Sequence, residues 1–173
     1  MKSELHKILG LGTLIALTAL VSGCGRETMP EPVTTVAPPE GSLITADGTV
    51  VDADSVTADR VGLYFSAIWC PPCRDFTPLL VDAYNELNAG EKAFEVIFVS
   101  ADRDHEAMTR YMVEYEMPWL AVPFADEART TLPRDHQVRG IPRLVILDGE
   151  GNVVVENAVS QVRSSGAAAF ANW

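Results

Sequence analysis

The chain has 173 residues, and its 24 acidic residues outnumber its 13 lysines and arginines, which gives a formal net charge of −11 at pH 7. This negative balance argues against nucleic acid or an anionic surface as a binding partner. With only three cysteines, the chain is not a disulfide-stapled scaffold, so its fold must rest on a hydrophobic core. Its length is sufficient for one domain with such a core.

Residues 1–23 have the pattern of a secretory signal. Lys2 and Lys7 give a basic start, and an apolar stretch follows at residues 8–21. That stretch is shorter than the roughly 20 residues that a membrane-spanning helix needs. We therefore expect these residues to direct the chain into export.

The signal ends in Val21-Ser22-Gly23-Cys24, which resembles a bacterial lipobox with Val in place of the commoner Leu. The resemblance implies that Cys24 is lipidated and begins the mature protein, on the periplasmic side of a bacterial membrane. Gly25, rather than Asp, follows the cysteine and favours the outer membrane by resemblance to enterobacterial sorting. The alternatives are an ordinary cleaved signal with an unmodified cysteine, or an uncleaved anchor.

Residues 24–41 form a proline-rich stretch that also contains glutamate and threonine. Such a composition cannot build a core and behaves as a semi-extended spacer. We expect it to hold the folded domain, residues 42–173, away from the membrane.

Hydrophobic periodicity predicts alternating strands and helices in the folded domain. The expected strands are 43–44, 49–51, 61–67, 94–99, 144–147 and 153–155; the expected helices run from Cys73 to near Gly90 and over 104–115 and 126–132. Asp47-Gly48 predicts a hairpin between the first two strands, and Asp102 or Asp104 is the expected cap of the second helix. A strand–helix–strand–helix stretch followed by a hairpin predicts a mixed sheet with helices on both faces.

The central motif is Trp69-Cys70-Pro71-Pro72-Cys73-Arg74, which lies between a buried strand and a helix. Its two prolines suit the first helical turn, where a missing N–H costs little. A thiol at a helix N-terminus faces the positive end of the helix dipole, which favours the thiolate that attacks disulfides. Two thiols separated by two residues can close a small ring, so the motif predicts a redox pair.

The cysteine pair fits a structural, metal-binding or haem-binding role less well. A structural disulfide across so short a loop removes little chain entropy. Zinc needs two more ligands, and the third cysteine and the three histidines are not paired at finger spacing. Haem attachment needs a histidine directly after the second cysteine, where the chain has Arg74. We therefore expect redox chemistry with neither a metal nor a cofactor.

The element order and several segments resemble the thioredoxin superfamily, in particular its tryparedoxin and nucleoredoxin branch. The resemblance covers roughly residues 43–173 and is carried by Leu63-Tyr64-Phe65-Ser66-Ala67, the motif at 69–74, Phe76-Thr77-Pro78, and the segments 94–102, 117–124 and 138–142. It implies an α/β thioredoxin fold, with a central mixed β-sheet flanked by helices on both faces. It also implies that Cys70 is the exposed, attacking thiol and that Cys73 is the shielded, resolving one, the two forming a redox-active disulfide.

The resemblance also implies a substrate surface. In this superfamily the proline that corresponds to Pro142 is cis and faces the active-site disulfide. The backbone of Ile141 is then expected to hold an extended substrate chain beside Cys70. The expected substrate-binding residues are Trp69, Pro71, Pro72, Ile141 and Pro142.

Two positions depart from classical thioredoxin. Tyr64 stands where thioredoxin has a buried Asp, so the carboxylate often proposed to accept the second thiol's proton is absent. Arg143 stands where the family more often has Thr after the cis-proline. Arg74 and Arg143 either place positive charge near the thiols, which lowers their pKa and attracts anionic substrates, or are simply solvated. Trp119 either walls the site or packs in the core.

These observations predict an exported, membrane-anchored thiol–disulfide oxidoreductase, and resemblance to the reducing branches of the superfamily implies that it reduces protein disulfides. The expected partners are protein disulfide substrates, an upstream membrane or periplasmic electron donor, and the membrane itself through the lipid on Cys24, but not nucleic acid. One alternative is a dedicated reductant for cytochrome c maturation or for a peroxidase. The other is a redox-inert adaptor lipoprotein, against which the intact cysteine pair argues.

Overall fold

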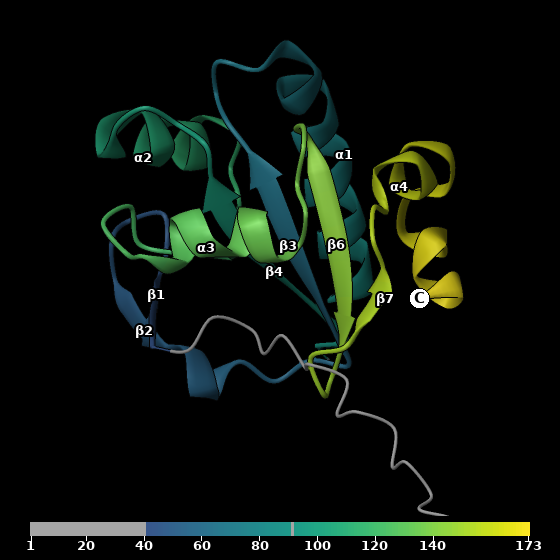
Figure 1. The fold of residues 1–173 in the computed structure, drawn as a ribbon. Helices are drawn as coiled ribbons and strands as arrows, with labels where there is room; N and C mark the ends of the chain where they lie inside the picture. Colours follow the sequence, from purple (N-terminus) through teal and green to yellow (C-terminus); the bar gives the residue numbers. More distant parts are fainter. Residues whose placement is uncertain (1–40, 91) are drawn as a thin grey trace, which may run out of the picture. The chain divides into compact units, whose positions relative to one another are not determined.

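The structure is a computed structural model that describes residues 41–90 and 92–173 (Figure 1). The predicted signal, Cys24 and residues 24–40 of the predicted spacer lie outside the described residues. In the described part of the chain, no helix is both long enough and apolar enough to cross a membrane.

A seven-stranded sheet with the order β2-β1-β5-β4-β3-β6-β7 forms the centre of the domain. Its strands are β1 (Ser42–Ile44), β2 (Val50–Asp52), β3 (Arg60–Ser66), β4 (Phe94–Ser100), β5 (Leu120–Ala121), β6 (Arg143–Asp148) and β7 (Val153–Val155). β3 pairs in parallel with β4 and antiparallel with β6. Both faces of β3 and β4 are buried, which is why most residues of these two strands are apolar. The mixed sheet confirms the predicted architecture.

Helices cover both faces of the sheet, as predicted (Figure 1). They are α1 (Pro71–Leu87), α2 (His105–Glu114), α3 (Ala128–Asp135) and α4 (Val159–Ser165), with short 3₁₀ helices η1 (Ala53–Ser55) and η2 (Gly166–Asn172). α1, α2, α4 and η2 contribute to one buried cluster, whereas α3 contributes Leu132 to a second. Tyr64 belongs to the first cluster and its neighbours Leu63 and Phe65 to the second, so the two clusters lie on opposite faces of β3.

One helix differs from its predicted limits, and the structure decides between the two caps predicted for another. The sequence predicts that α3 ends before Pro133, but the helix continues through it to Asp135 and ends within one turn of the proline. Of the two aspartates proposed as the cap of α2, Asp104 is the one that accepts a hydrogen bond from the Ala107 N–H, at 2.7 Å. Asp102 is therefore left for another role, described below.

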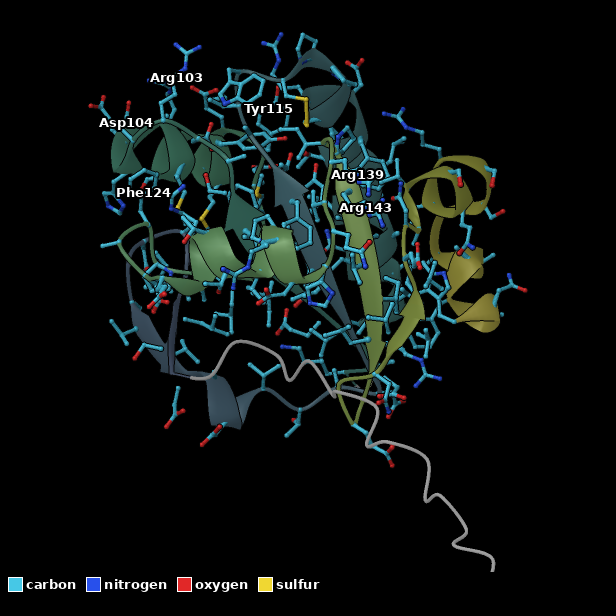
Figure 2. The ribbon with its side chains drawn as sticks, viewed as in Figure 1. Arg103, Asp104, Tyr115, Phe124, Arg139 and Arg143 are labelled. Atoms are coloured by element: carbon cyan, nitrogen blue, oxygen red, sulfur yellow. A yellow bond between two sulfur atoms is a disulfide. The ribbon has the colours of Figure 1, made fainter. Side chains whose placement is uncertain are left out.

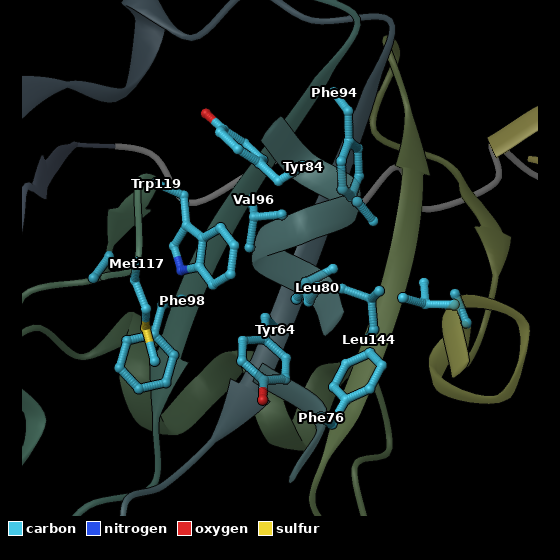
Figure 3. Close-up of a cluster of buried hydrophobic side chains, with 14 of the residues drawn as sticks. Tyr64, Phe76, Leu80, Tyr84, Phe94, Val96, Phe98, Met117, Trp119 and Leu144 are labelled. Carbon is cyan, nitrogen blue, oxygen red and sulfur yellow. The ribbon is translucent and has the colours of Figure 1, made fainter. Parts of the chain in front are cut away.

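The core beneath the end of β3 is rich in aromatic side chains (Figure 3). The Tyr64 ring lies 5.8 Å from the Phe76 ring, 6.1 Å from Phe98 and 6.2 Å from Trp119, between ring centroids. Trp119 is 1 % exposed, so of its two predicted roles the structure shows the packing role. This rigid layer supports the strand end from which the cysteine motif extends.

Candidate active site

The two cysteines lie at the junction between β3 and α1. β3 ends at Ser66 and α1 begins at Pro71, so Cys70 is the extended N-cap residue and Cys73 lies in the first turn. The N–H groups of Cys73 and Arg74 each donate to the Cys70 carbonyl oxygen, at 3.1 Å. The two cysteines form a disulfide, and their Cα atoms are 5.2 Å apart. The predicted pair is thus closed at the positive end of a long helix.

The disulfide is less exposed to solvent than predicted. Cys73 is fully buried, as expected, but Cys70 is only 4 % exposed, so the prediction of an exposed Cys70 is wrong. The reason is that its sulfur lies against the backbone of Ile141, with Sγ 3.8 Å from the carbonyl oxygen. Trp69, directly before it, is 52 % exposed. The Trp69 ring and a small edge of Cys70 are therefore accessible from outside, whereas Cys73 is not.

The loop before β6 forms the other wall of the site. The Ile141–Pro142 peptide bond is cis, as the resemblance implied. β6 begins only at Arg143, and among the described residues the Ile141 N–H and C=O have no backbone hydrogen-bond partner. Both groups are thus available to an extended peptide beside Cys70.

Comparison with known proteins identifies this arrangement. A thioredoxin-like family profile matches residues 59–153. The chain belongs to the thioredoxin-like family. It is 48 % identical over 135 residues to probable nucleoredoxin 1 of Arabidopsis thaliana, a match that covers 78 % of this chain and 23 % of that protein. The chain thus spans about a quarter of the length of the curated nucleoredoxins that it matches.

Solved structures show the same fold. Thioredoxin from Wuchereria bancrofti superposes with a TM-score of 0.68 and 38 % identity, over 73 % of this chain and 88 % of that chain. Tryparedoxin from Trypanosoma brucei gives a TM-score of 0.68 and 33 % identity, over 78 % of this chain and 92 % of that chain. These matches confirm the predicted thioredoxin fold and support the nucleoredoxin and tryparedoxin branch.

Asp102 anchors the loop that leads into the thioredoxin-like motif. Its Oδ1 accepts a hydrogen bond from the Ile68 N–H at 2.9 Å, and its Oδ2 accepts one from the Ser100 hydroxyl at 2.8 Å. The Trp69 indole N–H donates to the neighbouring Ala101 carbonyl at 3.1 Å. The end of β4 therefore holds the two residues before Cys70. Burial is the main effect on Asp102 and raises the pKa of its carboxyl above the usual value.

Replacing Asp102 with asparagine should change how stability depends on pH. Because the folded state raises the pKa of Asp102, it binds this proton more tightly than the unfolded chain does. The stabilising contribution of Asp102 is therefore full below the unfolded pKa of about 3.9 and is lost as pH rises through the higher folded value. Urea unfolding at several pH values should show wild type losing stability relative to Asp102→Asn across that window. The prediction is contradicted if the difference in free energy of unfolding between wild type and Asp102→Asn stays constant as pH rises, or if it changes in favour of wild type.

Four buried hydroxyl groups form a connected network under the first turn of α1, where thioredoxin has its carboxylate. Thr77 Oγ1 donates to the Cys73 carbonyl at 2.9 Å and lies 2.8 Å from the Tyr64 hydroxyl and 2.6 Å from that of Tyr111. Ser66 Oγ donates to the Tyr64 hydroxyl at 2.9 Å and lies 3.0 Å from that of Tyr111. Burial raises the pKa of both tyrosines above the usual value, so the network stays neutral. It fixes the turn that carries Cys73 but supplies no anionic base for its proton.

Thr77→Val is expected to lower the free energy of unfolding by about 1–3 kcal/mol, because it leaves a buried tyrosine hydroxyl without one of its partners. Thr130→Val is the matched control, since Thr130 is exposed and its hydroxyl donates only to the Glu127 carbonyl. Chemical denaturation of both variants measures the difference. Equal losses in the two variants would show that the network adds no stability.

The two arginines predicted to tune the thiols differ in their solvent exposure. Arg74 is exposed on α1. Arg143, labelled in Figure 2, is half-buried, and its Nη2 lies 3.8 Å from Oε2 of Glu156. Their effect on the thiols stays a prediction. Sequence reasoning missed Arg163 on α4, which donates to the Pro72 carbonyl at 3.0 Å and so braces the motif. No pattern in the sequence had indicated α4, so nothing pointed to this contact.

Proposed function

We propose that this chain is an exported, membrane-anchored thiol–disulfide oxidoreductase that reduces protein disulfides. The observation that carries the proposal is the Cys70–Cys73 disulfide at the N-terminus of α1, beside Ile141, whose N–H and C=O have no backbone hydrogen-bond partner in the described part of the chain. Similarity to thioredoxin, nucleoredoxins and tryparedoxins supports this chemistry. The reducing direction is part of the proposal, because the same pair can exchange disulfides either way.

The proposed reaction has two exchange steps. In the dithiol form, the Cys70 thiolate attacks one sulfur of the substrate disulfide, that bond breaks, and the other substrate sulfur leaves as a thiolate. The Cys73 thiolate then attacks the Cys70 sulfur and displaces the remaining substrate sulfur. Two electrons pass to the substrate, whose two thiolates take up protons, and the Cys70–Cys73 disulfide is formed. An external dithiol donor must return the electrons.

Turnover of a protein disulfide tests the proposal. The full chain, supplied with dithiothreitol, is expected to accelerate reduction of the insulin interchain disulfides well above dithiothreitol alone. A chain that is reduced by dithiothreitol but gives no acceleration would be an adaptor with a thioredoxin fold. If turnover is accelerated, trapping with Cys73→Ser in the native host would identify the physiological substrates, including any apocytochrome or peroxidase.

Membrane anchoring is proposed from Val21-Ser22-Gly23-Cys24. Mass spectrometry of the protein isolated from its host should show a mature chain that begins at Cys24 and carries acyl groups, since more than one chain is needed for stable anchoring. Cys24→Ser is expected to release the protein from membranes without changing its circular dichroism spectrum. A different mature N-terminus, or an unmodified Cys24, would contradict anchoring and leave the redox chemistry untouched.

A further inference from the structure

A groove lies beside the disulfide, between the end of β4, α3 and the loop before β6. Its volume is about 340 Å³. Its lining is mainly apolar and includes Trp69, Ala101, Arg129, Val138, Gly140 and Ile141. Trp69 directly precedes Cys70, and the Ile141 carbonyl lies 3.8 Å from its sulfur, so the groove opens where a substrate disulfide must dock.

Arg129 is the one charged side chain among the described residues that line this groove. Its guanidinium is fixed in place: Nε donates to the Phe124 carbonyl at 2.8 Å, Nη1 donates to the Ser100 carbonyl at 3.4 Å, and Cζ lies 4.2 Å from the centre of the Phe124 ring. No carboxylate in the described part of the chain forms an ion pair with it, and none lines the groove. Two of its five N–H donors are used, so donors remain for a ligand.

Two more arginines lie close to the lining residues in sequence. Arg103 follows Ala101 by two residues and Arg139 precedes Gly140, and neither forms an ion pair with a described carboxylate (Figure 2). Asp102 and Asp104 flank Arg103, so the charge inside the groove comes from Arg129 itself. A fixed guanidinium in an apolar groove binds a carboxylate by short, charge-assisted hydrogen bonds.

We infer that Arg129 selects protein disulfides in which an acidic side chain flanks the attacked cysteine. An extended peptide paired with the Ile141 backbone sends the neighbouring side chain into the groove, where an apolar stem contacts Trp69 and Val138 and its carboxylate meets Arg129. Glutamate, with two methylenes and a terminal carboxylate, fits this combination. Arg129 is thus a specificity-determining residue, and the inference rests on the proposed disulfide exchange without altering its chemistry.

Three synthetic disulfide-linked peptide dimers test the inference, in which the cysteine is flanked by Glu, by Gln or by Lys. With the full wild-type chain and dithiothreitol, kcat/KM is expected to be about tenfold higher for the Glu dimer than for the Gln dimer, the size of one charge-assisted contact. Arg129→Gln should remove that preference and leave the Gln dimer within about twofold of wild type. Arg134→Gln is the matched control on the same helix, since Arg134 is exposed and pairs with Asp135 outside the groove.

A charge reversal keeps the test independent of any damage to the fold. Arg129→Glu should prefer the Lys dimer to the Glu dimer, a gain that a misfolded protein cannot show.

Equal slowing of all dimers by Arg129→Gln would assign Arg129 to support of the Phe124 segment and overturn the inference. Equal wild-type rates on Glu and Gln dimers would also overturn it, while the proposed function stands. Oxidised glutathione is the small acidic disulfide to compare with the Glu dimer. If wild type reduces both with equal kcat/KM, and Arg129→Gln slows both equally, the groove selects small acidic disulfides and the inference of a protein substrate fails. Absence of turnover on every dimer and on insulin would instead contradict the proposed function.

Discussion

Cys70→Ser is expected to abolish reduction of protein disulfides, whereas Cys73→Ser should still attack a substrate and then stop. Cys70 is the N-cap of α1 and is the cysteine of the pair that retains an exposed edge, while Cys73 has none. Without Cys73, the mixed disulfide between Cys70 and the substrate has no resolving thiol. Non-reducing electrophoresis should therefore show a covalent adduct with insulin for Cys73→Ser and none for Cys70→Ser. Cys24→Ser serves as the control and should keep full turnover.

The reactivity of each thiol toward an alkylating reagent distinguishes Cys70 from Cys73 in the reduced protein. Iodoacetamide labelling across pH, followed by peptide mapping, should modify Cys70 below the pH range of a free thiol, whose pKa is about 8.5, because the helix dipole favours its thiolate. Cys73 should label later, since it is fully buried. If Cys73 is labelled first and at lower pH, the two roles are reversed. If neither is labelled below the free-thiol range, the chemical basis of the proposed function is lost.

Much of the fold was predictable because its central elements carry strong local signals. β3 and β4 are mainly apolar strands, α1 has both an apolar face and two prolines at its start, and Asp47-Gly48 marks the β1–β2 hairpin. The motif at the start of α1 was sufficient to predict a redox pair at a strand–helix junction, without any knowledge of the sheet. By contrast, α4 and η2 are short and rich in serine, glycine and alanine, so they lack the periodicity that reveals a helix.

The missed parts of the site depend on contacts between distant residues. Tyr64 was recognised as an unusual residue, but its partner network includes Tyr111 on α2 and Thr77 on α1, which only the packing of the helices on the sheet brings together. Arg129 reaches the groove because α3 lies against the end of β4, a placement that no local pattern encodes. The covering of Cys70 by Ile141 likewise joins two loops that are 71 residues apart. Local sequence patterns therefore predict the reacting atoms better than the surface around them.

Substitutions at Trp69 and Trp119 should affect substrate reduction and stability, respectively. Trp119→Ala is expected to lower the free energy of unfolding by about 3–5 kcal/mol, because a fully buried ring that packs edge-on against Tyr64 and Tyr84 leaves a cavity. Trp119→Phe should cost less, since the indole N–H has no hydrogen-bond partner among the described residues. Trp69→Ala should cost under about 1 kcal/mol, because Trp69 is half exposed, yet it should lower kcat/KM for protein disulfides.

Urea denaturation and insulin reduction, measured on the same three variants, decide between these roles. Trp119→Ala should retain its turnover per folded molecule at a temperature where it stays folded, since its ring lies in the core layer and not in the lining of the groove. A loss of turnover without a loss of stability would instead make Trp119 a wall of the active site. A large stability loss in Trp69→Ala would mean that its indole bond to the Ala101 carbonyl holds the motif in place more strongly than its exposure indicates.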